Sequence, residues 1–193
     1  LLGMATLLFD TSLNRFTIGP EDVVENLDWS QRGQGWIGSQ DGVRLSREAP
    51  HVVQLTRGAG QPRLPFILRD LPLPLPSDHL LVRVSVRTAD VPDAEIAWEL
   101  ASLHIEHFDR WNRRLGYWPY RLAALAGDSG WQSLEKVFPV MPEAARLRFV
   151  AFIGGPQGTL ELTQLSIRPA HETPVSRAIG WALRAAWVLL LLA

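Results

Sequence analysis

A series of short segments in which apolar and polar residues alternate constrains the fold more than any other feature of the sequence. The clearest runs from Leu80 to Thr88, where valines at every second position alternate with Arg83, Ser85 and Arg87. Successive side chains of a β-strand point to opposite faces, so this segment is predicted to be a strand with one buried face. Four more segments have strand character: Val52–Thr56, Phe66–Leu71, Arg146–Ile153 and Thr159–Arg168. Short strands at this spacing predict an all-β chain folded as an antiparallel β-sandwich.

Turn and breaker residues separate the expected strands. Residues 128–130 (Asp-Ser-Gly) and 154–158 (Gly-Gly-Pro-Gln-Gly) have compositions typical of turns. Pro72, Pro74 and Pro76 are separated by single leucines, and such a run cannot form a central strand or a helix. It is predicted to be a stiff crossing between the two sheets.

The segment 93–115 admits two interpretations. A helix would have Asp93 as its N-cap and Gly116 just past its end. A strand over Ala97–Phe108 would alternate, with Leu103 and His104 on opposite faces. We favour the strand, because a sandwich needs a partner for the strand at Leu80 there.

Composition bounds the class of protein. The chain has 193 residues, 47% of them hydrophobic, which suffices for one sandwich-sized core with short flanking segments. Its formal net charge of -1 gives no general attraction for nucleic acid, so no nucleic-acid partner is expected. There is no cysteine, which excludes disulfides and thiolate metal sites.

Apolar segments flank the expected sandwich. We interpret residues 1–9 as the end of a hydrophobic, transmembrane segment, residues 10–170 as the sandwich, and residues 171–193 as the start of a C-terminal transmembrane or interfacial helix. In the C-terminal segment, arginines that can extend toward headgroups alternate with tryptophans that suit the membrane interface. These membrane-interface candidates are Arg177, Trp181, Arg184 and Trp187. The alternative is an amphipathic helix docked on the domain.

The order of these signals resembles the galactose-binding-like jelly roll, the fold of many carbohydrate-binding modules. The residues that carry the resemblance, between about Val23 and Pro169, are Gly35-Trp36 after Glu25–Trp29, the strands Val52–Thr56 and Leu80–Thr88, Gly127–Trp131 with Val137–Pro139, and the closing pattern Leu147–Ile167. The resemblance implies a jelly-roll sandwich that binds a glycan, a cell surface or a neighbouring domain. Many members carry a structural calcium ion, but its ligands are not matched in this chain, and no other cofactor is expected.

The strongest candidate for a binding surface lies between residues 111 and 121. Its aromatic side chains can stack on sugar rings, and its arginines can bind hydroxyl or acidic groups. The candidate residues are Trp111, Arg113, Arg114, Tyr117, Trp118, Tyr120 and Arg121. Two alternatives stay open, since the same residues could contact lipid headgroups or a protein subunit, or could close one end of the sandwich as structure.

His104, Glu106, His107 and Asp109 are the only cluster that resembles a metal site. On a strand, His104 and Glu106 share one face while His107 and Asp109 share the other, so the ligands would not converge and no metal site is predicted. The cluster also lacks a nucleophile beside a positioned base, and no catalytic residue is predicted. Trp36, and Trp131 likewise, follow a glycine just before a strand and are predicted to plug the core.

Our first hypothesis is therefore a non-catalytic module of a membrane protein, positioned by contact with envelope polysaccharide or a protein partner. The expected location is the bacterial inner membrane, with the domain facing the periplasm. One alternative is a purely structural subunit of a membrane complex without a ligand. Another is an envelope carbohydrate-active enzyme, which would need His104, Glu106 or His107 to converge with an acid in a cleft.

Overall fold

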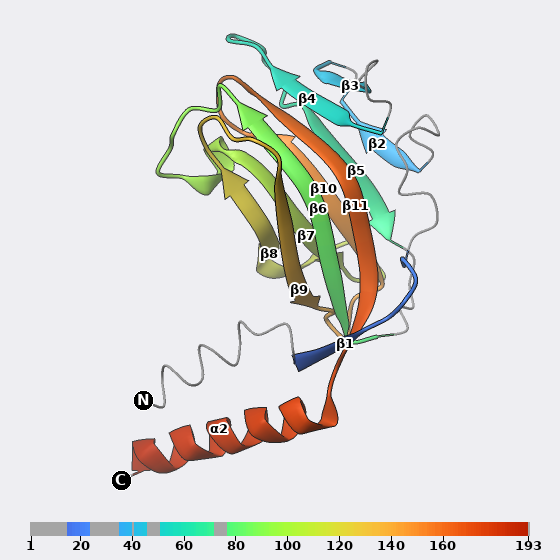
Figure 1. The fold of residues 1–193 in the computed structure, drawn as a ribbon, viewed down its shortest axis with the longest axis vertical. Helices are drawn as coiled ribbons and strands as arrows, with labels where there is room; N and C mark the ends of the chain where they lie inside the picture. The colour runs from blue at the N-terminus through green and yellow to red at the C-terminus, as the bar shows by residue number, and fades with distance from the viewer. Residues whose placement is uncertain (1–14, 24–34, 40, 46–50, 72–76, 193) are drawn as a thin grey trace.

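The computed structural model of the chain describes residues 15–23, 35–39, 41–45, 51–71 and 77–192. Over these residues the chain forms two antiparallel β-sheets packed face to face, and helix α2 (Pro174–Leu192) leaves one end of the sandwich (Figure 1). The predicted all-β sandwich with a C-terminal helical segment is confirmed.

The first sheet has the strand order β3-β4-β11-β6-β9, and β1 also pairs with β11. Its strands are β1 (Phe16–Ile18), β3 (Val43–Leu45), β4 (Val53–Arg57), β6 (His79–Ala89), β9 (Gln132–Pro139) and β11 (Gly158–Glu172). The second sheet has the order β2-β5-β10-β7-β8. Its strands are β2 (Trp36–Gly38), β5 (Phe66–Leu71), β7 (Ala101–Phe108), β8 (Arg114–Leu125) and β10 (Arg146–Ile153).

The core lies between the two sheets. Val82, Val84 and Val86 of β6 are fully buried, as their alternation with arginine and serine predicts. From the second sheet, β10 contributes Leu147 and Phe149, which are equally inaccessible. Burial of these apolar faces is the main force that holds the two layers together.

Within the ambiguous segment 93–115, residues 101–108 form strand β7, and β8 begins at Arg114. β7 pairs with β10 on one side and β8 on the other, and a single 3-10 turn, η3 (Ala97–Glu99), precedes it. The strand thus begins at Ala101, four residues later than predicted. The cause is local, since Glu99 N donates to the carbonyl of Ile96 at 2.9 Å and tightens the chain just before the sheet.

The two tryptophans predicted to plug the core differ. Trp36 is partly buried and packs edge-on against Phe149, with ring centroids 6.1 Å apart, so its prediction is confirmed. Trp131 is 45% exposed, and the prediction is wrong there. It precedes β9, the edge strand of the first sheet, where its ring lies 5.0 Å from the guanidinium of Arg87 instead of entering the core.

The first and last strands of the described chain meet at one end of the sandwich, where β1 pairs with the last residues of β11 (Figure 1). An ion pair of 2.6 Å joins Arg15 to Glu172 beside them. Thr173 caps α2, because its Oγ1 accepts a hydrogen bond from the backbone N–H of Ser176 at 3.2 Å. The helix has 19 residues and a mean hydropathy of 1.5, so its length and composition suit a membrane span.

Three features of the sequence interpretation lie outside the described residues. They are the apolar segment 1–9, the residues Glu25–Trp29 that precede the Gly-Trp pair, and the proline crossing at 72–76. These predictions stay predictions.

Candidate functional site

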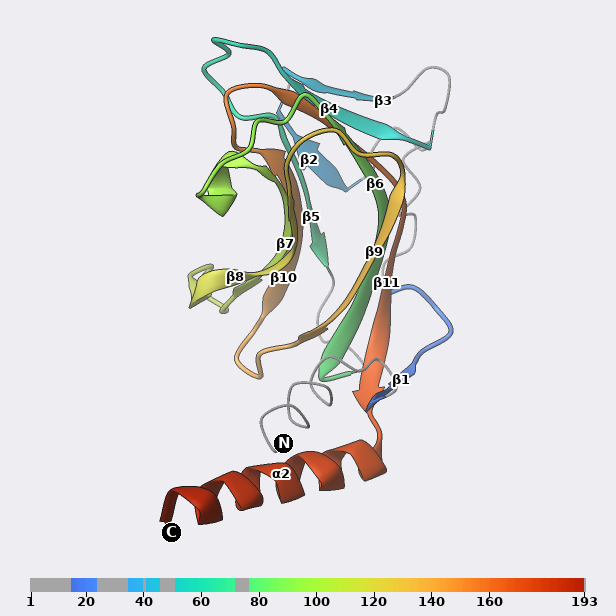
Figure 2. The same cartoon turned by 60° about the vertical axis from the view of Figure 1, so that its left-hand side comes forward.

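The outward side of the second sheet carries the densest set of polar and aromatic side chains described here. Leu103 and Ile105 of β7 point into the core, so their neighbours His104 and Glu106 point outward. The strand register places further side chains beside them. The outer face, as used below, consists of Phe66, Leu68, Asp70, Ser102, His104, Glu106, Phe108, Arg114, Arg121, Arg146, Arg148, Val150 and Phe152. Figure 2 shows that β7 and β10 curve so that this side of the sheet is concave.

The segment that contains η3 borders one end of the outer face. Ser102 Oγ donates a hydrogen bond to the carbonyl of Ala97 at 2.9 Å, which ties the 3-10 turn to β7. The guanidinium of Arg121 lies 5.5 Å from the ring centroid of Trp98, within range of a cation–π interaction. At the same end, the rings of His104 and Phe152 meet edge to face at 5.6 Å.

Gly154 fixes the position of this segment. Its N–H donates to the carbonyl of Leu100 at 3.1 Å, and its own carbonyl accepts from Arg57 Nη1 at 2.6 Å. A β-carbon at Gly154 would lie 1.4 Å from the carbonyl oxygen of Trp98. Only glycine therefore allows the β10–β11 turn to approach the backbone of η3 this closely.

Ion pairs cross the middle of the outer face. Asp70 accepts from Arg148 Nε at 2.7 Å and from Arg146 Nη1 at 3.0 Å, and both guanidiniums lie over the ring of Phe108, at 5.1 and 4.5 Å from its centroid. Partial burial opposes ionisation of Asp70, but the two arginines outweigh it and lower its pKa.

Glu106 is the second carboxylate of the outer face. It lies 3.7 Å from His104 Nε2 and 3.8 Å from Arg114 Nη1. The interaction with His104 is the largest cause of a lowered pKa for Glu106, burial opposes it, and the positive charges of Arg114 and Arg148 add to the decrease. Both outer-face carboxylates are thus ionised at neutral pH.

The β7–β8 hairpin borders the other end of the outer face and is organised by Asp109. Its Oδ1 accepts hydrogen bonds from the backbone N–H groups of Trp111 and Arg113, each at 2.9 Å, and its Oδ2 accepts from Arg113 Nε at 2.8 Å. Burial alone would raise the pKa of Asp109, but these hydrogen bonds lower it overall. Asn112 adopts a positive φ of 64° in the turn.

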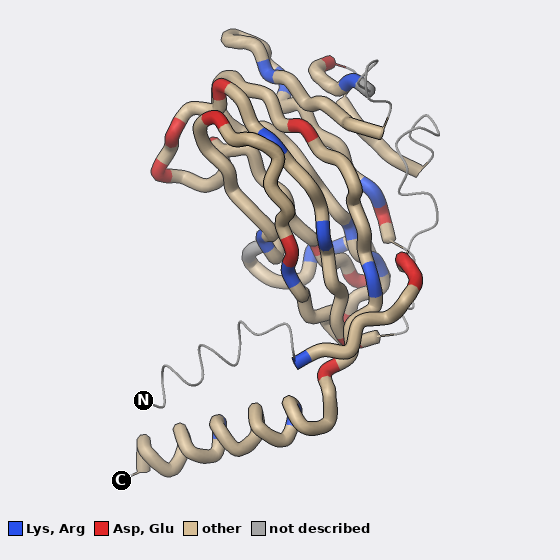
Figure 3. Tube along the Cα trace, in the orientation of Figure 1, with Lys and Arg blue, Asp and Glu red and all other residues tan. Residues whose placement is uncertain are grey.

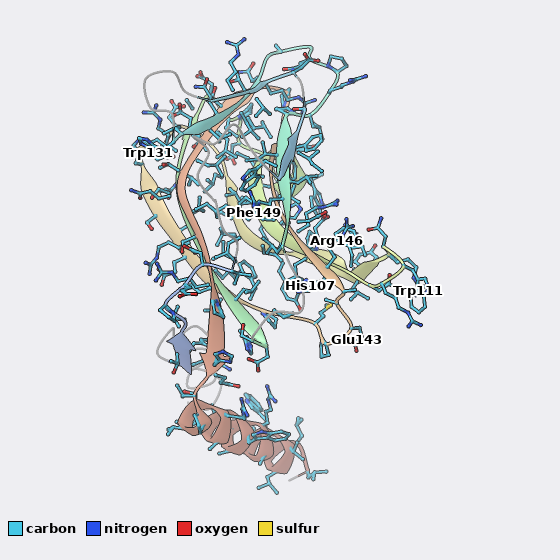
Figure 4. The ribbon with its side chains drawn as sticks, turned by 90° about the vertical axis from the view of Figure 1, so that its right-hand side faces the viewer. His107, Trp111, Trp131, Glu143, Arg146 and Phe149 are labelled. Atoms are coloured by element: carbon cyan, nitrogen blue, oxygen red, sulfur yellow. The ribbon has the colours of Figure 1, made fainter. Side chains whose placement is uncertain are left out.

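This turn holds Trp111 away from the sandwich, as Figure 4 shows. The indole is 61% exposed, and two guanidiniums lie within cation–π range, Arg110 at 3.9 Å and Arg113 at 4.8 Å from the ring centroid. Tyr117, just beyond the turn, is 79% exposed. The hairpin therefore presents aromatic faces beside the outer face of the sheet.

The structure divides the seven residues proposed from sequence for this surface. Trp111, Arg113 and Tyr117 are exposed on the hairpin, and Arg114 and Arg121 belong to the outer face. Tyr120 points inward, with its ring 5.1 Å from His107 and 6.3 Å from Phe138, so it does not belong to the exposed surface. The description of the structure does not include the side chain of Trp118.

Several residues of the face were not singled out by the sequence analysis. They are Asp70, Arg146 and Arg148, with Trp98 at the border of the face, together with His104 and Glu106, which were weighed as metal ligands and as catalytic groups but not as part of a binding surface. Alternation in Arg146–Ile153 shows that its arginines point away from the core. It does not show which residues of other strands lie beside them.

The four residues of the metal-like cluster do not converge. His104 and Glu106 share the outer face, whereas His107 points inward and its Nε2 lies 3.1 Å from the carbonyl of Pro139. The carboxylate of Asp109 accepts a hydrogen bond from Arg113 within the hairpin. Among the residues that the structure describes, no three His, Cys, Asp or Glu side chains come together in a group that could hold a metal ion.

His107 makes stability depend on pH. Burial lowers its pKa below the ordinary value of 6.5, and the hydrogen bond to Pro139 opposes this only in part. Because the folded state binds this proton less readily than the unfolded state, the contribution is full above pH 6.5 and is lost as pH falls toward the folded pKa.

We therefore expect wild-type protein to lose more unfolding free energy between about pH 7.5 and about pH 5.5 than a His107→Gln variant, which keeps a donor for Pro139. Urea unfolding at the two pH values measures this, with His51→Gln at an exposed position as the control. The carboxylates with lowered pKa values titrate below this window. Equal losses in all three proteins would contradict the assignment to His107.

Comparison with known proteins adds information about the fold. No protein-family model and no curated protein sequence matches the chain. Among solved structures, the enzymatically active domain of tailspike protein 4 from bacteriophage CBA120 is 12% identical with a TM-score of 0.52, covering 76% of this chain and 21% of that one. The CBM22-1–GH10 modules of xylanase 10B from Clostridium thermocellum, complexed with xylohexaose, are 10% identical with a TM-score of 0.51, covering 78% and 29%.

The described domain has the jelly-roll fold of carbohydrate-binding modules. The CBM22-1 xylan-binding domain of Paenibacillus barcinonensis Xyn10C, at 17% identity and a TM-score of 0.48, matches over 78% of this chain and 97% of its own length. The matches with TM-scores above 0.5 confirm, at the level of fold, the resemblance expected from the sequence. The chain spans less than a third of the first two similar chains, and identities this low concern the fold alone.

Proposed function

We propose that the domain is a non-catalytic carbohydrate-binding module whose ligand lies on the outer face of the second sheet, between η3 and the β7–β8 hairpin. The observation that carries the proposal is the combination of an exposed, positioned Trp111 with the accessible side chains of Asp70 and Arg114 on one concave sheet. Aromatic faces stack on the C–H faces of sugars, and guanidinium and carboxylate groups bind their hydroxyls. The fold is shared with part of a chain that comprises CBM22-1 and GH10 modules and is complexed with xylohexaose, which supports this role.

The electrostatics of the outer face favour binding over hydrolysis. A glycosidase needs one carboxylic acid whose pKa is raised so that it can protonate the leaving group. Asp70 and Glu106 both have lowered pKa values, because arginines and His104 stabilise their ionised forms. Neither can supply that proton at neutral pH, so these two carboxylates serve as hydrogen-bond acceptors.

A paired substitution tests the binding site. Replacing Trp111 and Tyr117 together by alanine is expected to weaken glycan binding about tenfold or more, since each aromatic contact contributes about 0.5–1.5 kcal/mol. The matched control is Trp131→Ala, which removes an exposed indole from the first sheet. A glycan array followed by calorimetry on the bound glycans provides the measurement. Equal affinities in the variant and control, or no bound glycan in the array, would contradict the proposal.

We further propose that α2 lies in the bacterial inner membrane, with the sandwich on the periplasmic side. Support comes from the helix itself, where only Ser176 is buried and the residues from Val188 to Leu192 are all exposed and apolar. Arg184 lies 5.8 Å from the ring of Trp181, near the middle of the helix. Such arginine–tryptophan pairs suit the depth of the headgroups.

Vesicle flotation tests the membrane assignment. The wild-type chain is expected to float with vesicles of phosphatidylethanolamine and phosphatidylglycerol, and Leu189→Asp/Leu190→Asp is expected to stay at the bottom, because each charge in the bilayer centre costs about 3 kcal/mol. Leu64→Asp/Ile96→Asp, at exposed positions of the sandwich, is the matched control.

Cysteine labelling shows on which side of the membrane the sandwich lies. The variant Ser133→Cys carries a single cysteine, since the chain has none of its own. Labelling by an impermeant maleimide in intact spheroplasts is expected, and labelling only after lysis would overturn the periplasmic assignment.

A further inference from the structure

Positive charge is concentrated on the surface that is proposed to hold the glycan. The outer face and the hairpin together carry six arginines and three carboxylates, an excess of three positive charges, in a chain whose net charge is -1. The six arginines are Arg110, Arg113, Arg114, Arg121, Arg146 and Arg148. The three carboxylates are Asp70, Glu106 and Asp109. Such a local excess attracts an anionic ligand although the chain as a whole does not.

The opposite sign gathers at the other end of the sandwich. Four acidic residues lie within ten positions around η3, and a fifth lies in the turn before β9 (Figure 3). They are Asp90, Asp93, Glu95, Glu99 and Asp128. Apart from Arg121, which lies near Trp98, the arginines are therefore on the hairpin side of the face, and an anionic ligand has a preferred position there.

Hydrogen bonds and ring contacts hold the arginines in place before any ligand arrives. One carboxylate, Asp70, accepts from both Arg146 and Arg148, and Glu106 is the cross-strand neighbour of Arg148. Arg146 also donates to Asn112 Oδ1 in the hairpin. A guanidinium fixed in this way binds a carboxylate with little further loss of conformational freedom.

Arg110 and Arg114 complete the positive end. Arg110 stacks on the exposed indole of Trp111, and Arg114 donates to the carbonyl of Tyr117 at 3.1 Å. The guanidinium of Arg110 thus lies on an aromatic side chain of the proposed sugar-stacking surface, and that of Arg114 is bonded to the backbone of the other aromatic residue. An acidic sugar stacked on Trp111 or Tyr117 places its carboxylate within reach of an arginine.

We propose that the module recognises an acidic polysaccharide built from uronic acids, whose carboxylates bind Arg110 and Arg114 at the hairpin end of the outer face. This inference rests on the proposed function and adds the class of sugar. A planar carboxylate matches the two parallel donors of a guanidinium, whereas a neutral sugar leaves the excess positive charge without a partner.

The test compares one polysaccharide with and without its charge. Polygalacturonate is expected to bind at least about tenfold more tightly than its fully methyl-esterified form, which keeps the backbone and removes the carboxylates. The affinity for polygalacturonate is expected to fall as NaCl is raised from about 50 mM to about 200 mM, because salt screens contacts between exposed charges. Equal binding of the acid and the ester would overturn the proposal.

Paired arginine variants locate the contact. Arg110→Gln/Arg114→Gln is expected to weaken polygalacturonate binding roughly three- to tenfold, as for the loss of two exposed charge pairs. Arg63→Gln/Arg83→Gln makes the same change in net charge at exposed positions outside the face and is expected to bind like wild type. Equal losses in both double variants would show a general effect of net charge and overturn the proposed site.

The outcomes separate this inference from the function on which it rests. If neutral xylan or galactan binds best and depends on Trp111 and Tyr117, the carbohydrate-binding function stands and the acidic class falls. If no polysaccharide of either kind binds, both fall. Inorganic polyphosphate serves as a polyanion without sugar rings, and binding as tight as that of polygalacturonate would reduce the site to unspecific anion binding and overturn the inference.

Discussion

Replacing Gly154 by alanine is expected to lower the free energy of unfolding by about 3 kcal/mol or more, the range of core overpacking and strained backbone. The added β-carbon would lie 1.4 Å from the carbonyl oxygen of Trp98 and 2.6 Å from its carbon. Both are backbone atoms, so no change of rotamer relieves the overlap. Either the β10–β11 turn or η3 must move, and the hydrogen bond from Gly154 N to Leu100 is lost with it.

Thermal unfolding measures this effect against a neutral glycine. For a chain of this size, about 3 kcal/mol corresponds to a decrease in Tm of roughly 6–12 °C. Gly130→Ala is the control, because a β-carbon there meets nothing within 4 Å. Since Trp98 borders the outer face, a folded Gly154→Ala protein should also show altered glycan binding. Equal melting temperatures for the two variants would contradict the close packing of this turn on η3.

Phe149→Ala is expected to cost about 3–5 kcal/mol, because it leaves a cavity where a fully buried ring packs against Trp36. Phe152, three positions further along the same strand, provides the matched comparison. It points outward, is partly exposed and meets the ring of His104 at 5.6 Å. Its replacement by alanine is expected to cost about 1 kcal/mol, within the range of partly exposed sites.

Urea unfolding of both variants gives the comparison, provided that the slopes against denaturant agree with that of the wild type. A large difference between Phe149→Ala and Phe152→Ala confirms that one face of β10 forms the core and the other is accessible. Equal losses would mean that the outer face is covered as well, which would remove the surface on which a glycan is proposed to lie.

The strands could be predicted where alternation is local and strong. Arg146–Ile153 coincides with β10, because its inward face must be apolar. Phe66–Leu71 also coincides with β5, although Arg69 lies on its inward side. The segment that contains β7 was ambiguous for a physical reason. Its short apolar pattern fits either period, and only pairing with β8 and β10 decides between them.

The same distinction between local and distant information applies to the site. The hairpin at Trp111 could be proposed from sequence because its aromatics and arginines are neighbours along the chain. The pairs of Arg146 and Arg148 with Asp70 could not, since they join residues 76 and 78 positions apart and follow from the register of β5 on β10. Trp131 was misassigned because a Gly-Trp pair before a strand does not reveal whether that strand lies at the edge of its sheet.

The pairing of β1 with the last residues of β11 determines how the domain carries mechanical load. Tension applied beyond Glu172 runs along β11, whose pairs with β6 extend from Thr159 and Ala89 to Ala170 and His79. The hydrogen bonds across that interface are perpendicular to the pull, so they share the load and must yield together. A pull that separates the two ends of the chain instead acts on β1, where three residue pairs open one after another. When a ligand pulls on the domain while both ends of the chain are held, the load thus runs along β11, the direction in which the pairs resist together.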